Sequence, residues 1–179
     1  MSQLPPPADA AELVREALPG ALLDVKEFRG ETTLIVAPES VVEIARFLRD
    51  TRGLVFNFLS DISAVDYYPE ATRPGRFGVC YHLYSHLYSR RIRIKVFLQE
   101  DDPVLETVTG LWPAANWLER EIFDMMGITF EGHPDLRRVL MPQDWEGHPM
   151  RRDYPLGYET VMFTFNRVEI NKHKPYAKE

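Results

Sequence analysis

Residues 111–156 read LWPAANWLEREIFDMMGITFEGHPDLRRVLMPQDWEGHPMRRDYPL, and this stretch carries most of the information in the chain. Pro113 fits the first turn of a helix, where its missing N–H has no partner in any case. Gly127 fits the left-handed position that ends a helix. We therefore predict a helix from about Pro113 to Met126.

This helix should have an apolar side and a charged side, because successive side chains lie about 100° apart around a helix. The apolar arc comprises Leu118, Ile122, Met125 and Met126. Arg120 and Asp124 form an i,i+4 pair on the opposite side. Glu119 and Glu121 border the apolar arc, so each carboxylate must be paired or protonated where apolar surface covers it.

The segment after the helix repeats itself, as EGHPDLRR at 131–138 and as EGHPMRRD at 146–153. Each copy has a glycine that permits a turn, a proline that prevents helix at the preceding histidine, and an arginine pair. We hypothesise that this loop lies back over the helix and that some of its arginines meet Glu119 and Glu121. The four candidate arginines are Arg137, Arg138, Arg151 and Arg152.

Three motifs of this region, LEREIFDMMGI, GHPDLRRVL and DWEGHPMRRDYPL, closely resemble the C subunit, or 30-kDa subunit, of the respiratory NADH:quinone oxidoreductase, complex I. The similarity is dense from about Leu54 to Leu156 and looser before that. Met126 stands where the family more often has phenylalanine, and both residues fill apolar space.

The resemblance implies a subunit of the hydrophilic arm of complex I that binds no cofactor or metal and has no catalytic residue of its own. It implies other peripheral-arm subunits as partners, especially the D (49-kDa) subunit and the B subunit. FMN, iron–sulfur clusters, NADH and quinone would then be used in or near other subunits, with electron transfer coupled to proton translocation. The family motif positions, expected to have structural and interface roles, are Glu119, Arg120, Glu121, Asp124, His133, Arg137, Arg138, Asp144, His148, Arg152 and Asp153.

The composition is that of a globular protein: of 179 residues, 45% are hydrophobic and 27% are charged. Apolar runs are far shorter than the roughly 20 residues that span a bilayer, and the N-terminus lacks a secretory signal. We expect a peripheral protein at the cytoplasmic face of the inner membrane, bound only through partner subunits. The net charge of −6 argues against nucleic-acid binding. Cys80, the single cysteine, excludes sites that need two thiolates from this chain.

The pattern along the chain predicts an α+β fold, with a mixed or antiparallel sheet covered by helices on one face. Ile92, Ile94 and Val96 alternate with Arg91, Arg93 and Lys95, which gives one apolar and one cationic face. The predicted helices are 8–18 and 38–51, and the predicted strands are 22–28, 32–37, 54–62, 77–85, 90–98 and a β-like run at 160–168. We divide the chain into a core domain (1–126), an irregular Arg-rich loop on the central helix (127–157) and an extended interaction tail (158–179).

Other interpretations remain open at this point. His133, His148, Asp135 and Asp144 could bind a metal ion in a stand-alone metal-dependent hydrolase. No HxxxH or HxH spacing sets two imidazoles on one face, so histidines bonded to backbone in turns are favoured. The cationic strand face is either solvated or a docking surface for an acidic partner. A third possibility is the equivalent subunit of a ferredoxin-driven or hydrogenase-type membrane complex.

Overall fold

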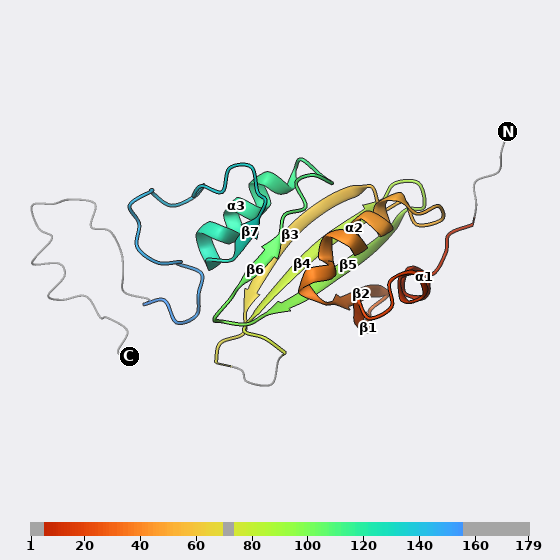
Figure 1. Cartoon of the computed structure of the whole chain (residues 1–179), viewed down its shortest axis with the longest axis horizontal. Coiled ribbons are helices and arrows are strands. Elements are labelled where there is room, and N and C mark those ends of the chain that lie inside the picture. Colours follow the sequence, from red (N-terminus) through yellow and green to blue (C-terminus); the bar gives the residue numbers. More distant parts are fainter. Residues whose placement is uncertain (1–5, 70–73, 156–179) are drawn as a thin grey trace, which may run out of the picture.

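A five-stranded mixed sheet is the centre of the fold (Figure 1). The structure is a computed structural model and describes residues 6–69 and 74–155. The strands are β1 (Leu22–Phe28), β2 (Glu31–Val36), β3 (Phe58–Asp66), β4 (Phe77–Ser85) and β5 (Arg90–Leu98), in the spatial order β1-β2-β5-β4-β3. Within this sheet, only β2 and β5 pair in parallel, through Thr33–Ile35 and Arg93–Lys95.

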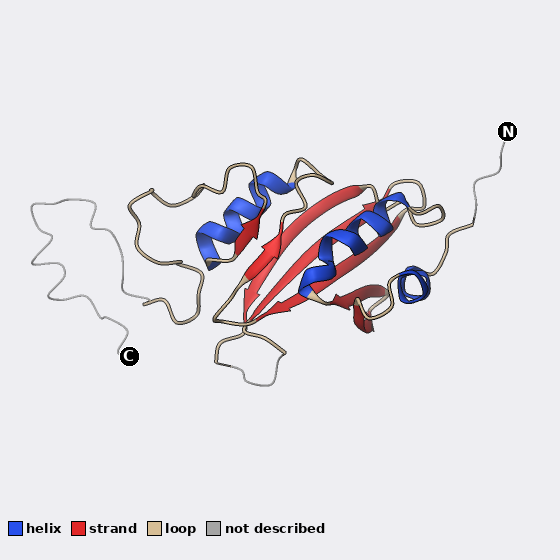
Figure 2. Ribbon diagram, viewed as in Figure 1, coloured by secondary structure: helices blue, strands red, loops and turns tan. Residues whose placement is uncertain are grey.

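Helices lie on one face of this sheet (Figure 2). They are α1 (Ala10–Ala17), α2 (Val41–Asp50) and α3 (Ala115–Met126). A short 3₁₀ helix, η1 (Pro38–Ser40), leads into α2. The side chain of Asp9 caps α1 by accepting hydrogen bonds from the amides of Ala11 and Glu12. The predicted α+β fold, with its mixed sheet and helices on one face, is confirmed.

The alternation along β5 separates the two faces of the sheet as predicted. Ile92, Ile94 and Val96 are buried under the helices, whereas Arg93 and Lys95 are only half-buried. The same apolar layer continues through the neighbouring strands, with Leu34 on β2, Val79, Tyr81 and Leu83 on β4, and Leu59 and Ile62 on β3. The core therefore lies between one face of the sheet and the helices.

The third strand begins later than the sequence predicts, at Phe58 instead of Leu54. Leu54 and Phe56 are buried, but they lie in the turn after α2, where the amide of Phe56 donates to the carbonyl of Leu48. A short run of buried apolar residues has the same sequence pattern as a strand, even when it pairs with no other strand. Because of this offset, Asp66 ends β3 and does not lie in the loop after it.

A second, two-stranded parallel sheet pairs β6 (Val104–Glu106) with β7 (Thr129–Glu131). Residues 127–157 were expected to be irregular throughout, so β7 is a difference from the prediction. Ile128 and Phe130 are buried and fix this strand in the core. Beyond β7, residues 132–155 form no helix or strand and run along α3. The tail 158–179, with its predicted β-like run, lies outside the described residues.

Among the described residues, no helix is both long enough and apolar enough to cross a membrane.

Candidate interaction site

The C-terminal end of α3 is the centre of the region singled out by the sequence. Helix α3 ends at Met126, as predicted, and Gly127 adopts the left-handed conformation with φ of 72°. A Cβ at Gly127 would also come within 2.6 Å of the side chains of Arg151 and His148. Glycine is thus required here both for its backbone conformation and for the close approach of the loop.

The loop supplies hydrogen bonds to the end of α3, where the last four carbonyls of a helix have no partner within the helix. In each bond a nitrogen of the loop donates to a carbonyl of α3: Gly127 N to Phe123 O (2.9 Å), His148 Nδ1 to Asp124 O (3.0 Å), Met150 N to Met125 O (3.0 Å) and Arg151 Nε to Met126 O (2.7 Å). All four carbonyls are therefore satisfied, and a cation lies at the negative end of the helix dipole.

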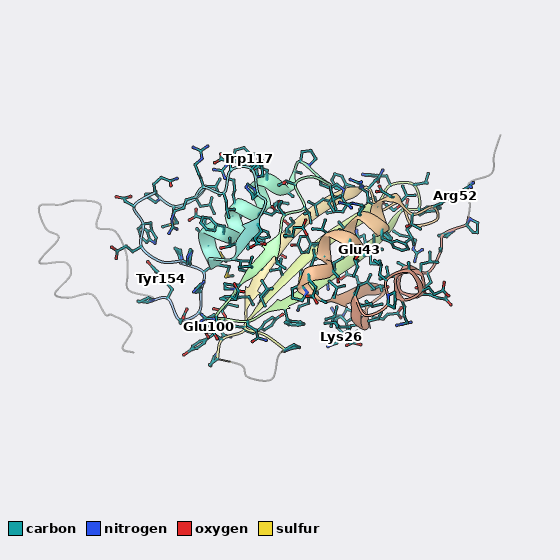
Figure 3. All side chains as sticks on the ribbon, in the orientation of Figure 1. Lys26, Glu43, Arg52, Glu100, Trp117 and Tyr154 are labelled. Atoms are coloured by element: carbon teal, nitrogen blue, oxygen red, sulfur yellow. The ribbon has the colours of Figure 1, made fainter. Side chains whose placement is uncertain are left out.

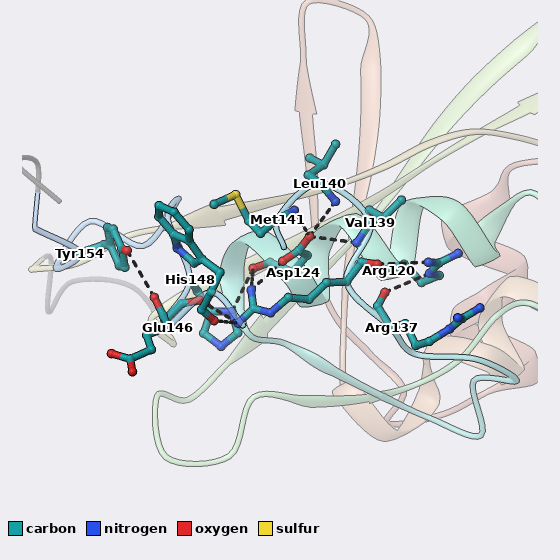
Figure 4. Close-up of polar contacts among 12 residues, drawn as sticks. Arg120, Asp124, Arg137, Val139, Leu140, Met141, Glu146, His148 and Tyr154 are labelled. Atoms are coloured by element: carbon teal, nitrogen blue, oxygen red, sulfur yellow. Dashed lines mark hydrogen bonds and ion pairs between the residues drawn. The ribbon is translucent and has the colours of Figure 1, made fainter. Parts of the chain in front are cut away.

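Asp124 is completely buried and binds the first half of the loop (Figure 4). Its Oδ2 accepts hydrogen bonds from three consecutive amides, those of Val139 (3.0 Å), Leu140 (2.8 Å) and Met141 (2.9 Å). Its Oδ1 lies 2.7 Å from a guanidinium nitrogen of Arg138. Burial acts to raise the pKa of Asp124, but these amides and the guanidinium outweigh it and hold the pKa below the usual value.

Arg138 connects the two halves of the repeated segment. While one of its terminal nitrogens contacts Asp124, the other donates to the carbonyls of Trp145 (2.9 Å) and Gly147 (3.1 Å). Arg120 donates to the carbonyls of Arg137 (3.0 Å) and Arg138 (3.2 Å) and not to Asp124. The expected i,i+4 pair on α3 is therefore replaced by bonds from α3 to the loop.

A second charged cluster holds the end of the loop against the sheet. Arg76, immediately before β4, contacts Asp66 at the end of β3 through two bonds of 3.1 and 2.9 Å. It also lies 2.6 Å from Asp153 and forms an ion pair with Glu100. The amide of Arg152 donates to Asp66 Oδ2 (2.9 Å). The loop residues Arg152 and Asp153 thus meet a pair that the sequence did not indicate.

The guanidinium of Arg76 lowers the pKa values of the two aspartates that it contacts, Asp66 and Asp153. Burial acts to raise the pKa of Asp66, but Arg76 and the amides of Tyr68 and Arg152 outweigh it, so the pKa lies below the usual value. The hydrogen bond from Arg76 likewise lowers the pKa of Asp153. Both carboxylates are therefore charged at neutral pH.

Glu119 is buried without an arginine, so the hypothesis that a loop arginine meets it is wrong. Its carboxylate accepts hydrogen bonds from the hydroxyl of Thr107 and the amide of Val108 (2.8 Å), and His133 Nε2 lies 3.9 Å away. His133 Nδ1 accepts a bond from the amide of Asp135 (3.0 Å), and no arginine or lysine of the described residues forms an ion pair with Glu119. Burial accordingly raises the pKa of Glu119.

The hypothesis is also wrong for Glu121, which is exposed and forms no ion pair with any described residue. Asp144 is likewise exposed and has no hydrogen bond or ion pair within the described ranges. The remaining predicted positions fall into three groups: Arg120, Asp124, Arg137, Arg138 and His148 at the end of α3, Arg152 and Asp153 at Arg76, and Glu119 with His133 beside Thr107.

The histidines contact backbone, as the favoured interpretation predicts. Besides its bond from Asp135, His133 approaches the carbonyl of Asn116 through Nε2 (3.2 Å). Asp135 itself pairs with Arg137 at 2.6 Å. Across residues 6–69 and 74–155, no three His, Cys, Asp or Glu side chains gather in a way that could hold a metal ion. The geometry therefore gives no support to the hydrolase hypothesis.

Glu119 provides a pH-dependent prediction. Because its pKa is raised above the usual 4.5 on folding, we expect the wild type to lose stability relative to Glu119→Gln as pH rises from about 4.5 through the folded pKa. The free energy of unfolding, measured in urea from pH 4 to 9, tests this. Glu121→Gln, on the exposed side of the same helix, is the control. A difference between wild type and Glu119→Gln that does not change with pH would contradict the buried, uncompensated carboxylate.

Residues 34–160 match the family described as respiratory-chain NADH dehydrogenase, 30 Kd subunit. The chain belongs to this 30-kDa subunit family. It is 54% identical to the C subunit of the NADH-quinone oxidoreductase from Roseiflexus sp. (strain RS-1), over 96% of this chain and 97% of the relative. It is 48% identical to the C subunit from Geobacter sulfurreducens, over 80% and 86% of the two chains. The resemblance drawn from the three sequence motifs is confirmed.

One solved structure agrees with this membership of the 30-kDa subunit family, and a second shares the fold. The trypsin-resistant fragment (1–134) of Nqo5 is 38% identical and covers 70% of this chain and 97% of its own, with a TM-score of 0.59. A chain of the membrane-bound sulfane sulfur reductase, an archaeal respiratory membrane complex, is 21% identical over 94% and 93% of the two chains, with a TM-score of 0.67. The second likeness bears on the fold alone. Membership of the 30-kDa subunit family gives the chain other subunits of the complex as partners.

Proposed function

We propose that this chain is a structural subunit of the hydrophilic arm of NADH:quinone oxidoreductase, without catalytic activity of its own. It holds neighbouring subunits in position, while FMN, iron–sulfur clusters and quinone are bound by those neighbours and NADH donates the electrons. The observation that carries this proposal is the dense hydrogen bonding of the loop to the Asp124 carboxylate and to the last carbonyls of α3. Asp124 alone accepts bonds from three amides and one guanidinium.

Side-chain nitrogens and oxygens that are hydrogen-bonded to the chain's own backbone and carboxylates fix the shape of a surface. They are not available to transfer a proton to a substrate. A general acid or base needs a nitrogen or oxygen within hydrogen-bond reach of the substrate. In the loop, His148 Nδ1 donates to Asp124 O, and both ring nitrogens of His133 face backbone groups. Arg138 is used in the same way, because it bonds to the Asp124 carboxylate and to loop carbonyls. These side chains give residues 132–155 a defined shape that a partner can recognise.

The partners we propose are the D (49-kDa) and B subunits, on the cytoplasmic face of the inner membrane. The family resemblance supplies these two neighbours, and the surface of the loop region supports a role in assembly. Leu140 and Met150 are 60% and 57% exposed although both lie in a segment fixed by hydrogen bonds. Apolar side chains held rigidly at a surface are typical of sites of protein–protein contact.

The test is to isolate the full-length chain with an affinity tag from detergent-solubilised membranes and to produce the same chain alone. We expect the first preparation to contain the D and B subunits, FMN, iron–sulfur clusters and NADH:quinone reductase activity, and the second to be colourless and inactive. Stoichiometric zinc or manganese in the isolated chain would contradict the proposal and favour the hydrolase hypothesis. Reduction of quinone by ferredoxin but not by NADH would favour the related membrane complex instead.

A further inference from the structure

A groove of about 170 Å3 runs between the edge strand β3 and helix α3. Met150 of the loop also lines it, and the amide of Met150 donates to the carbonyl of Met125. Its lining is mainly apolar or small and comprises Ile62, Ser63 and Ala64 from β3 and Ile122, Met125 and Met126 from α3. Methionine side chains adapt their shape to what binds against them, so this lining suits a protein partner.

Two acidic side chains, Asp61 on β3 and Glu121 on α3, line the same groove. Both are exposed, and neither has a hydrogen bond or ion pair with any residue in the described part of the chain. His82 pairs with Asp61 across the strands, but burial lowers the pKa of His82, so at neutral pH it gives no countercharge. Asp61 also borders a hollow on the open face of the sheet with Arg91 and Arg93, and Arg93 is paired there with Glu31 at 2.6 Å. No arginine or lysine of the described residues lines the groove between β3 and α3.

Two large, exposed apolar side chains lie at the groove and on the adjoining helix α3. Met150 is 57% exposed, and Trp117 is 62% exposed one helical turn before Glu121 (Figure 3). Arg120 stacks on the ring of Trp117 at 4.9 Å, which holds the ring in a defined orientation. A fixed, exposed tryptophan beside a methionine-lined groove has the composition of the centre of a protein–protein interface.

We propose that this groove receives a segment of a neighbouring subunit of the complex, which places an arginine or lysine between Asp61 and Glu121 and separate apolar side chains against Met150 and Trp117. The charge of the two carboxylates selects the cation, and the methionines accept the aliphatic part of its side chain. This inference rests on the proposed function, since it takes the occupant from the same complex. It adds the surface that is used and the chemistry of the segment that binds there.

Charge reversal tests the proposal in the assembled complex. We expect Glu121→Lys and Asp61→Lys to reduce the amount of chain that co-purifies with the complex by about tenfold, because like charges in an interface are strongly unfavourable. Glu43→Lys is the matched control, since Glu43 is an exposed glutamate on α2, away from the groove (Figure 3). All three isolated variants should unfold at the wild-type urea concentration. Retention equal to that of Glu43→Lys would overturn the proposal.

A photo-crosslinker at the groove identifies the occupant. We expect Met150→p-benzoylphenylalanine to give, on irradiation of membranes, a crosslinked peptide of another subunit with an arginine or lysine next to apolar residues. A crosslink to a second copy of this chain, to residues 156–179 of the same chain or to no protein would overturn the inference. If the unmodified chain failed to co-purify with the complex, the proposed function itself would be wrong, so the two failures are distinguishable.

Discussion

Replacing Asp124 by asparagine is expected to lower the free energy of unfolding by about 3–5 kcal/mol, the usual effect of leaving a buried charge without its partner. The Arg138 side chain is only 14% exposed and would keep its charge in a site without a carboxylate. The amides of Val139, Leu140 and Met141 would also lose a charged acceptor. Urea unfolding at pH 7, followed by tryptophan fluorescence, measures the effect.

Two further measurements make the prediction specific to this cluster. The double variant Asp124→Asn/Arg138→Met should be more stable than the sum of the single effects predicts, by at least about 1 kcal/mol, because the two groups interact directly. Since the pKa of Asp124 is lowered on folding, the stabilisation it gives is present above the usual pKa and is lost as pH falls through the folded pKa. A loss at pH 7 of less than about 1 kcal/mol would mean that the loop does not depend on Asp124.

Local patterns account for the parts of the fold that the sequence predicts well. The hairpin of β4 and β5 has the predicted bounds because alternation and a short turn are visible within twenty-two residues. The parallel pairing of β2 with β5 joins residues about sixty apart, through Thr33 and Arg93, and no local pattern contains it. The short strand β7 was missed for the same reason, since the whole of α3 separates it in the sequence from its partner β6.

The candidate site shows the same division. The helical periodicity correctly separates Asp124 from the apolar arc, but it cannot indicate that a loop covers that side and buries the carboxylate completely. Both sides of a helix can be buried when a later segment folds over it. The sequence likewise cannot tell which arginine pairs with which carboxylate, because that depends on distances in the folded chain. Loop arginines were expected to pair with Glu119 and Glu121, but Arg138 pairs with Asp124.

Arg76 and Asp66 could not be identified from spacing alone. They are ten residues apart, at the end of β3 and just before β4, and their third partner Asp153 lies far along the chain. The usable signal is chemical: an aspartate at the end of an apolar strand and an arginine just before the next one. Such a pair at the same edge of a sheet is a candidate buried ion pair even when no motif includes it.

Replacing Arg76 by methionine is expected to cost about 3–5 kcal/mol, because the Asp66 side chain is 1% exposed and would lose its countercharge. Arg76→Lys should cost less but should not be neutral, since an ammonium group cannot reproduce the two parallel bonds of the guanidinium. Urea unfolding at pH 7 gives both values. Arg91→Met, an exposed arginine on the open face of β5, is the control and should change stability by less than about 0.5 kcal/mol.

The pH dependence distinguishes lost charge pairing from lost packing in Arg76→Met. In the wild type, Arg76 and two amides hold the pKa of Asp66 below its usual value, so the stabilisation from this pair is lost as pH falls through the folded pKa. Without the guanidinium, burial raises the pKa of Asp66, and a protonated Asp66 no longer needs a countercharge. The stability difference between wild type and Arg76→Met should therefore be largest at neutral pH and should shrink on acidification. A difference that stays constant from pH 7 to pH 3 would show that Arg76 acts through its contacts with Tyr68 and Phe77 and not through its charge.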